Sequence, residues 1–148
     1  MTIDLAAAHE AFEASVDGTV GLEEEFAVCD PDTLELVPRF EELRERAVPP
    51  LADAISGELI RSEIEIRSGR GETFHDAVAR QREMRRLLFA HAARHGVVLG
   101  ATGTHAFSDY REQQFIDTEH YRRVSEGLQW VARRNNTFSL HVHVGVRG

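Results

Sequence analysis

The stretch VGLEEEFAVC at positions 20–29 decides the fold. Successive side chains of a β-strand point to opposite faces, so residues two apart share a face. On one face of this strand we expect only apolar side chains, except for Glu24, which we expect to pair with an arginine beneath the sheet. The other face carries Glu23 and Glu25. The stretch therefore predicts a strand with one face in the core and one acidic face.

Two further stretches repeat this design, at residues 59–67 and 138–146. In the first, Ile64 and Ile66 share a face with Ile60 and Ser62, while the opposite face alternates arginine and glutamate. In the second, phenylalanine, leucine and valines fill one face, which we expect to be buried. The polar faces carry Arg61, Glu63, Glu65 and Arg67 in the first stretch, and Ser139, His141, His143 and Gly145 in the second.

If the apolar faces of the three strands join one core, their polar faces form one surface. Four carboxylates and two imidazoles then converge, and carboxylates that crowd without a counter-charge repel one another. Divalent cations remove this repulsion, and oxygen-rich sites with an occasional imidazole suit Mg²⁺ or Mn²⁺. A single pair of glutamates is typical of the solvated face of an antiparallel sheet. The three pairs together favour a metal site.

The rest of the chain predicts helices placed between strands that pair antiparallel, which indicates an α+β domain over residues 1–148. Its sheet is mainly antiparallel and has helices on one face. Thr73 is expected to cap the longest helix, and Gly96 is expected to end it in a left-handed conformation. The expected helices span residues 1–16, 41–48, 73–95 and 118–134, and two short strands are expected at 34–37 and 97–101. In the last helix we expect Tyr121, Val124, Leu128 and Val131 on the buried face, with Trp130 in the core.

Composition excludes several classes of protein. All 17 basic residues are arginine, so there is no phosphate-loop lysine and no Schiff-base lysine. The single Cys29 excludes disulfides and cysteine zinc clusters, and it fits a reducing, cytoplasmic location. Residues 1–74 hold 18 acidic and 6 basic side chains, which disfavours nucleic acid as a partner and suits a cation. No apolar stretch is long enough for a membrane span, so a membrane partner is not expected.

At these residues the chain resembles the carboxylate–amine ligases of the glutamate–cysteine ligase type 2 family. The resemblance begins near Val20 and follows four motifs in order, with Ala106 and Tyr110 departing from the family's usual proline and tryptophan. Family members continue well beyond the last motif, so the resemblance implies the N-terminal part of a larger domain. The motifs read TVGLEEEF at 19–26, RSEIEI at 61–66, GTH at 103–105 and LHVHVGV at 140–146.

The resemblance implies a glutamine-synthetase-like domain whose sheet holds Mg²⁺ or Mn²⁺ and ATP. It also implies a reaction, in which ATP phosphorylates the γ-carboxylate of glutamate and the amine of cysteine displaces the phosphate. The small-molecule partners would then be amino acids and ATP. By motif position it implies metal ligands at Glu23, Glu25, Glu63, Glu65 and His141, a nucleotide contact at His143, and substrate contacts at Thr104 and His105.

Other interpretations stay open on the sequence. Arg61 and Arg67 either bind a substrate carboxylate or phosphate, or neutralise the neighbouring glutamates. The chain is alternatively a non-catalytic metal-binding or interaction fragment, or a metal-dependent hydrolase. An unfinished sheet edge would favour a homo-oligomer. The sequence does not settle which amine and which acid are joined, or whether these 148 residues are active alone.

Overall fold

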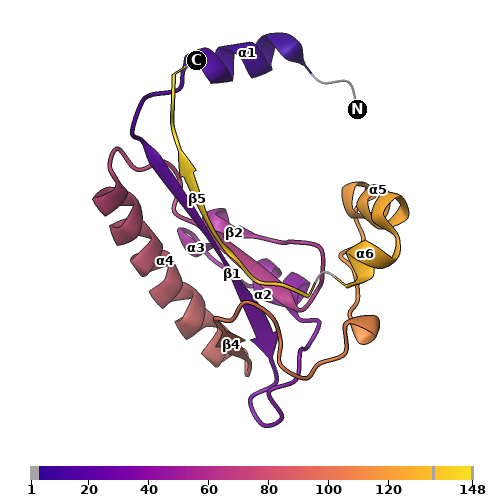
Figure 1. Ribbon diagram of the computed structural model, residues 1–148. Coiled ribbons are helices and arrows are strands. Elements are labelled where there is room, and N and C mark those ends of the chain that lie inside the picture. The colour runs from indigo at the N-terminus through magenta and orange to yellow at the C-terminus, as the bar shows by residue number, and fades with distance from the viewer. Residues whose placement is uncertain (1–3, 135, 148) are drawn as a thin grey trace.

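The computed structural model describes residues 4–134 and 136–147, and it confirms an α+β fold built on an antiparallel sheet (Figure 1). The strands follow the order β2-β3-β1-β4, and β5 also pairs with β1. Residue 148 and residues 1–3 of the expected first helix lie outside the described part. The strands are β1 (Val20–Cys29), β2 (Ile55–Ser56), β3 (Glu63–Arg67), β4 (Val98–Gly100) and β5 (Leu140–Val144).

Strand β1 is the centre of the sheet, and its two edges have different neighbours. One edge pairs with β3, which sets Glu25 opposite Glu65. The other edge is shared, because β4 pairs with Ala27–Cys29 while β5 pairs with the segment 20–24 and sets Glu23 opposite His141. Residues opposite one another in an antiparallel pair point to the same face. The register therefore brings side chains from three strands onto one face.

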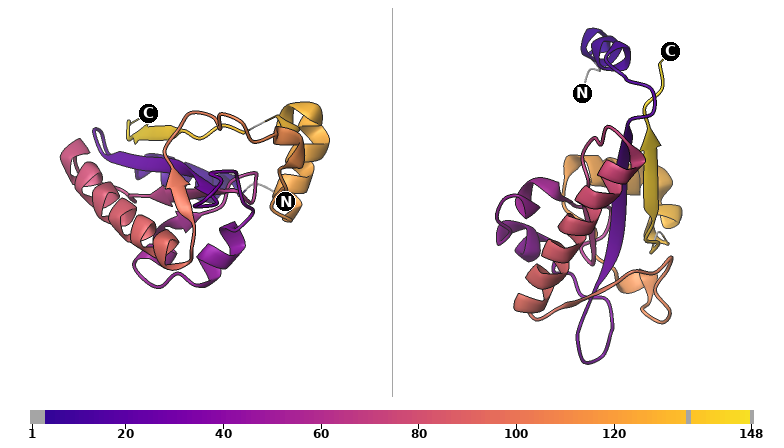
Figure 2. Two further views of the ribbon diagram at one scale, coloured as in Figure 1. Left: turned by 90° about the horizontal axis from the view of Figure 1, so that it is seen from below. Right: turned by 90° about the vertical axis from the view of Figure 1, so that its left-hand side faces the viewer.

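Three helices cover the other face of the sheet, namely α2 (Phe40–Glu45), α3 (Leu51–Ala54) and α4 (Phe74–Arg94). Figure 2 shows the long helix α4 lying along one side of the sheet. Each fully buried Ile or Phe contributes roughly 1.5–3 kcal/mol through removal of its apolar surface from water. In the described residues, no helix is long and apolar enough to cross a membrane. The core combines Phe26, Val28, Ile64 and Ile66 of the sheet with Phe40, Leu43, Leu51, Leu88 and Ala92 of the helices.

The predicted start and end signals of helix α4, Thr73 and Gly96, are confirmed. The Thr73 hydroxyl accepts a hydrogen bond from the Asp76 backbone amide, which satisfies one of the free donors at the helix start. Gly96 follows the helix with φ +69°, a conformation that glycine adopts without strain. The expected partner of Glu24 is Arg85 of this helix, whose guanidinium also lies over the Phe26 ring. Glu24 is thus a paired charge beneath the sheet.

Several elements differ from the sequence-based expectation in extent. Residues 34–37 form no strand, because Leu34 has φ +61° and only Leu36 bridges to Cys29. The strand expected from residue 59 begins at Glu63, since Ile60 instead bridges to Phe115 of a distant loop. The helix expected at 41–48 is α2. The helix expected at 1–16 is α1 (Leu5–Glu13), which extends away from the sheet (Figure 1) and buries none of its residues. Three short elements were not expected, namely α3, β2 and the 3-10 turn η1 (Tyr110–Glu112).

The prediction of a single helix at 118–134 is wrong. It is broken at Gln129, which has φ +46°, into α5 (Glu119–Leu128) and α6 (Trp130–Arg133). Because α6 starts in a new direction, the apolar stripe does not continue across the break. Tyr121 and Val124 pack against Leu59 and Ile60 as expected. Leu128, Trp130 and Val131 are more than half exposed, so their expected burial is wrong.

The burial expected for the apolar face of the last strand is also wrong. Phe138 is buried, but Leu140, Val142, Val144 and Val146 are 53–63% exposed. Their side chains lie on the helix side of the sheet, beside Leu22 and Val20 of β1. Helix α4 covers β1 and β3, where Ala77 packs on those two β1 residues, and it leaves the outer strand open. Side-chain alternation predicted correctly which residues of β5 share a face, but it could not show whether another element covers that face.

Candidate metal centre

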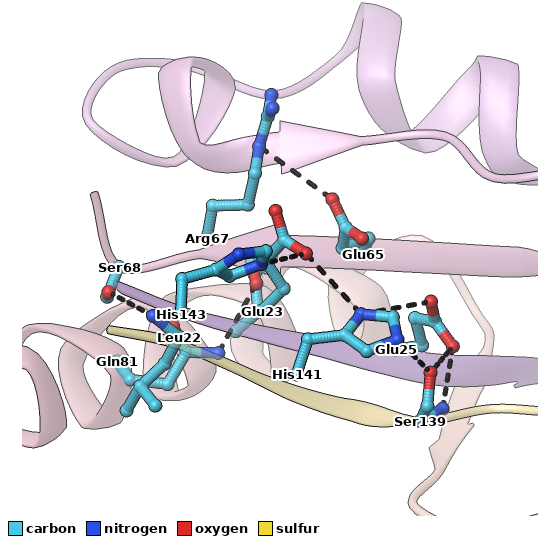
Figure 3. Close-up of polar contacts among 11 residues, drawn as sticks. Leu22, Glu23, Glu25, Glu65, Arg67, Ser68, Gln81, Ser139, His141 and His143 are labelled. Carbon is cyan, nitrogen blue, oxygen red and sulfur yellow. Dashed lines mark hydrogen bonds and ion pairs between the residues drawn. The ribbon is translucent and has the colours of Figure 1, made fainter. Parts of the chain in front are cut away.

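The polar face of the sheet gathers a cluster of glutamates and histidines from three strands (Figure 3). Glu23 and Glu25 come from β1, Glu65 comes from β3, and His141 and His143 come from β5. The convergence expected from side-chain alternation is confirmed, because each of these residues lies at a register position on the same face. Rigid strands fix the backbone of all five, which is the support that a precise binding site needs.

Hydrogen bonds hold the side chains nearest to β5 in place. The Ser139 amide and hydroxyl both donate to Glu25 Oε2 at 2.6 Å, and the same hydroxyl lies 3.1 Å from His141 Nε2. His143 Nε2 lies 2.9 Å from Glu23 Oε2. His141 Nδ1 points between the two β1 glutamates, 3.4 Å from Glu23 Oε2 and 3.9 Å from Glu25 Oε1. One imidazole nitrogen of His141 therefore faces the carboxylates.

The buried carboxylates of this cluster have perturbed acidities. Burial, followed by the negative charges of Glu25 and Glu58, raises the pKa of Glu63 to about 9. Burial, followed by the negative charge of Glu23, raises the pKa of Glu65 to about 7. The nearest cation to Glu65 is Arg67, whose Nε lies 3.7 Å away and whose side chain is half exposed. The cluster thus carries more negative charge than its own residues neutralise.

Two sets of ligand atoms in the cluster have the spacing that a divalent cation requires. One set is Glu23, Glu65 and His141, and the other is Glu25, Glu58 and Glu65; within each set the ligand atoms lie within 4.8 Å of one another. Mg²⁺ binds oxygen at about 2.1 Å, so opposite ligands lie about 4.2 Å apart. The all-carboxylate set suits Mg²⁺, and the set with an imidazole suits Mn²⁺ as well. Glu65 is the residue that the two sets have in common.

Glu58 is a candidate ligand that the sequence analysis missed. It lies in the loop between β2 and β3, where strand alternation makes no prediction. The loop is anchored next to it, since the Tyr121 hydroxyl donates to the Gly57 carbonyl at 2.7 Å. Burial, followed by the charges of Glu58 and Glu65, raises the pKa of Tyr121 to about 12. Burial and the neighbouring charge of Glu25 also raise the pKa of Glu58.

The remaining predicted site residues belong to neither of the two ligand sets. Glu63 lies on the same face of β3 as Glu65, where it is buried and hydrogen-bonded to Glu25. Arg61 precedes β3, where the alternation no longer applies, and its Nε pairs with Glu41 at 2.7 Å rather than with the strand glutamates. Thr104 donates to the Asn136 carbonyl, and the His105 ring bonds to the Leu34 carbonyl and the Ser108 amide. The structure therefore brings together the metal and nucleotide candidates and leaves Arg61, Thr104 and His105 in contacts outside the cluster.

The chain matches known proteins over most of its length. The model of a family described as "Glutamate-cysteine ligase family 2 (GCS2)" matches residues 19–148. "Putative glutamate--cysteine ligase 2-2" of Rubrobacter xylanophilus is 45% identical over 94% of this chain and 36% of its own length. "Glutamate--cysteine ligase" of Halobacterium salinarum is 34% identical over 93% of this chain and 38% of its own length. The chain thus spans little more than a third of these relatives.

Proposed function

The chain belongs to glutamate–cysteine ligase family 2, and from this premise we propose that its acidic sheet face binds two divalent cations and the phosphates of ATP in a carboxylate–amine ligase. The observation that carries the proposal is the convergence of Glu23, Glu25, Glu58, Glu65 and His141 into two ligand sets that share one carboxylate. A glutamine-synthetase-like sheet, as the family resemblance implies, is part of this proposal.

In the proposed site each residue has a separate task. Glu65 joins the two cation positions, Glu23 and His141 complete one, and Glu25 and Glu58 complete the other. These residues would hold Mg²⁺ or Mn²⁺, which would supply positive charge to neutralise the charge that develops in phosphoryl transfer. His143, which is exposed and bonded to Glu23, offers its imidazole to the nucleotide. Ser139 fixes Glu25 through two hydrogen bonds.

The proposed reaction joins a carboxylate to an amine in two steps. A carboxylate oxygen of glutamate attacks the γ-phosphorus of ATP, and ADP leaves, which gives an acyl phosphate. The amine nitrogen of cysteine then attacks the acyl carbon, phosphate leaves with the C–O bond electrons, and the nitrogen loses a proton to form the amide. We place this chemistry in the cytoplasm, where ATP is available, with the amino acids and ATP as its small-molecule partners.

Because the chain spans little more than a third of its relatives, nucleotide binding is a sharper test than turnover. We expect calorimetric titration with ATP to show binding in Mg²⁺ and none in EDTA. His143→Ala should weaken ATP binding at least tenfold, about 1.4 kcal/mol, because it removes the imidazole that we propose contacts the nucleotide. The stabilisation by Mg²⁺ alone should persist in that variant.

His75→Ala is the matched control, because His75 is exposed on the first turn of α4 and belongs to neither ligand set. It should bind ATP like the parent chain. Binding of the cation without ATP would instead favour a metal-binding module, the second interpretation of the sequence. Equal ATP binding in EDTA and in Mg²⁺ would contradict the proposal.

A further inference from the structure

The segment 57–62 joins β2 to β3 and carries Glu58, the one member of the two ligand sets that does not lie on a strand. The later part of this segment is bonded to the loop before α5, where the Ile116 amide donates to the Leu59 carbonyl at 3.0 Å. The Glu58 carboxylate itself forms no hydrogen bond or ion pair with a residue that the structure describes. Its direction therefore depends on the turn that precedes it, at Gly57.

Two neighbours fix the position of Gly57. A β-carbon at this residue would lie only 2.5 Å from the Phe40 ring, so the glycine backbone packs directly on the core. The Tyr121 hydroxyl donates to the Gly57 carbonyl at 2.7 Å. The core contact presses on the turn from one element, and the hydroxyl adds a directed polar bond from another. Tyr121 thus restrains the backbone next to the Glu58 side chain.

Tyr121 can act as a fixed support because its own position is set by two contacts. Its backbone amide donates to the Thr118 hydroxyl at 3.2 Å, at the start of α5. Its ring packs against the buried side chains of Leu59 and Ile60. Figure 1 shows α5 at the side of the sheet opposite α4. Tyr121 therefore reaches the turn from an element that carries none of the ligand residues.

The charges around Glu58 make such a restraint necessary. The carboxylates of Glu25 and Glu23 act on Glu58 as like charges, which repel it. Glu58 is half-buried, so an unrestrained turn would let its side chain swing toward water and lower this repulsion. Those conformations would have to be given up again when a cation binds. A turn that is held beforehand avoids this entropic cost and raises the affinity for the cation.

We propose that Tyr121 is a positioning residue, which holds the turn at Gly57 so that Glu58 reaches the cation position it shares with two strand glutamates. This inference rests on the proposed function, which supplies the two cation positions. The other position takes all of its ligands from strands of the sheet, whose backbone is fixed by the sheet itself. The Tyr121 hydroxyl should therefore affect one cation position and leave the position that contains His141 unchanged.

The test titrates the full chain with Mn²⁺ and follows binding by electron paramagnetic resonance. The imidazole of His141 marks one of the two expected ions through nitrogen hyperfine coupling. Tyr121→Phe removes the hydroxyl and keeps the ring. It should weaken binding of the ion without nitrogen coupling by about 10–100-fold, the usual effect of losing a group that orients a metal ligand. The affinity of the nitrogen-coupled ion should stay unchanged.

Two further variants show whether the hydroxyl acts through Glu58. Tyr110→Phe is the matched control, because Tyr110 is the other tyrosine of the chain and its ring lies beside Arg111 and Arg134. It should bind both ions like the parent chain. Glu58→Gln should weaken the same ion as Tyr121→Phe does. Adding Tyr121→Phe to Glu58→Gln should cause no further loss, because two changes that act through one ligand are not additive.

Three results would overturn this inference and leave the proposed function intact. They are unchanged Mn²⁺ binding in Tyr121→Phe, equal weakening of both ions in that variant, and a further loss when Tyr121→Phe is added to Glu58→Gln. Equal weakening would show that Tyr121 supports the fold as a whole rather than one cation position. A parent chain that binds no Mn²⁺ would instead contradict the proposed function, and this inference would fall with it.

Discussion

Saturating Mn²⁺ or Mg²⁺ should raise the melting temperature of the chain by roughly 5–10 °C. A cation at one hundred times its Kd stabilises the folded state by about 2.7 kcal/mol at one site. For a chain of this size each kcal/mol shifts the melting temperature by about 2–4 °C. The effect is large because the cation replaces repulsion among Glu23, Glu25 and Glu65 with attraction. Differential scanning calorimetry in EDTA and in each cation measures it.

Glu65→Gln should remove most of this shift, since the Glu65 carboxylate belongs to both ligand sets. The variant should still fold, because a neutral amide in a buried site of excess negative charge relieves repulsion. Glu72→Gln is the matched control, since Glu72 is exposed, pairs with Arg70 and belongs to neither ligand set. A shift of the same size in the Glu65 and Glu72 variants would show that the cation acts elsewhere.

Without divalent cations, the free energy of unfolding should fall as the pH rises from about 5 to 9. The folded-state pKa of Glu63 is about 9 and that of Glu65 is about 7, both above the ordinary value of 4.5. A group with a raised folded pKa stabilises the fold only while it is protonated, so its contribution is complete below pH 4.5. That contribution is lost as the pH rises through the folded pKa. The shift of Glu65 alone corresponds to a loss of about 3 kcal/mol, and ionisation of Glu63 adds to it.

Glu63→Gln should flatten this dependence above pH 7, because the amide mimics the protonated carboxyl and does not ionise. Urea denaturation midpoints from pH 5 to pH 9, in EDTA, test the expectation. Glu35→Gln provides the control, since Glu35 is exposed in the loop after β1. Stability that rises with pH in the parent chain, or an identical slope in the Glu63 variant, would contradict the electrostatic account. Added Mg²⁺ should restore stability at high pH.

Strand alternation predicted the orientation of the side chains but not all of their surroundings. It placed Glu23, Glu25 and Glu65 on one face because alternation follows from the backbone alone. It could not show that Leu140 and Val142 are exposed, since burial depends on where α4 ends its coverage of the sheet. The break at Gln129 was likewise invisible, because the helical spacing of apolar residues continues through it.

Two site residues that the sequence analysis missed or misplaced, Glu58 and Arg61, lie in loops. Glu58 reaches the cluster through the anchored turn at Gly57, and no periodic pattern links it to Glu25 or Glu65. Arg61 was placed on the acidic face by extending the alternation of β3 backward, but the regular strand begins only at Glu63. Tertiary contacts, here the Glu41 ion pair, decide the direction of such a side chain.

The most direct test of the central claim is to count Mn²⁺ ions bound per chain and record their electron paramagnetic resonance spectrum. The two ligand sets predict two ions that share the Glu65 carboxylate, so their spins should couple magnetically. One ion should also show nitrogen hyperfine coupling from an imidazole, which His141→Gln should remove. A spectrum that shows only uncoupled Mn²⁺ without nitrogen hyperfine coupling, and that does not change in the His141 variant, would contradict a metal centre on this face.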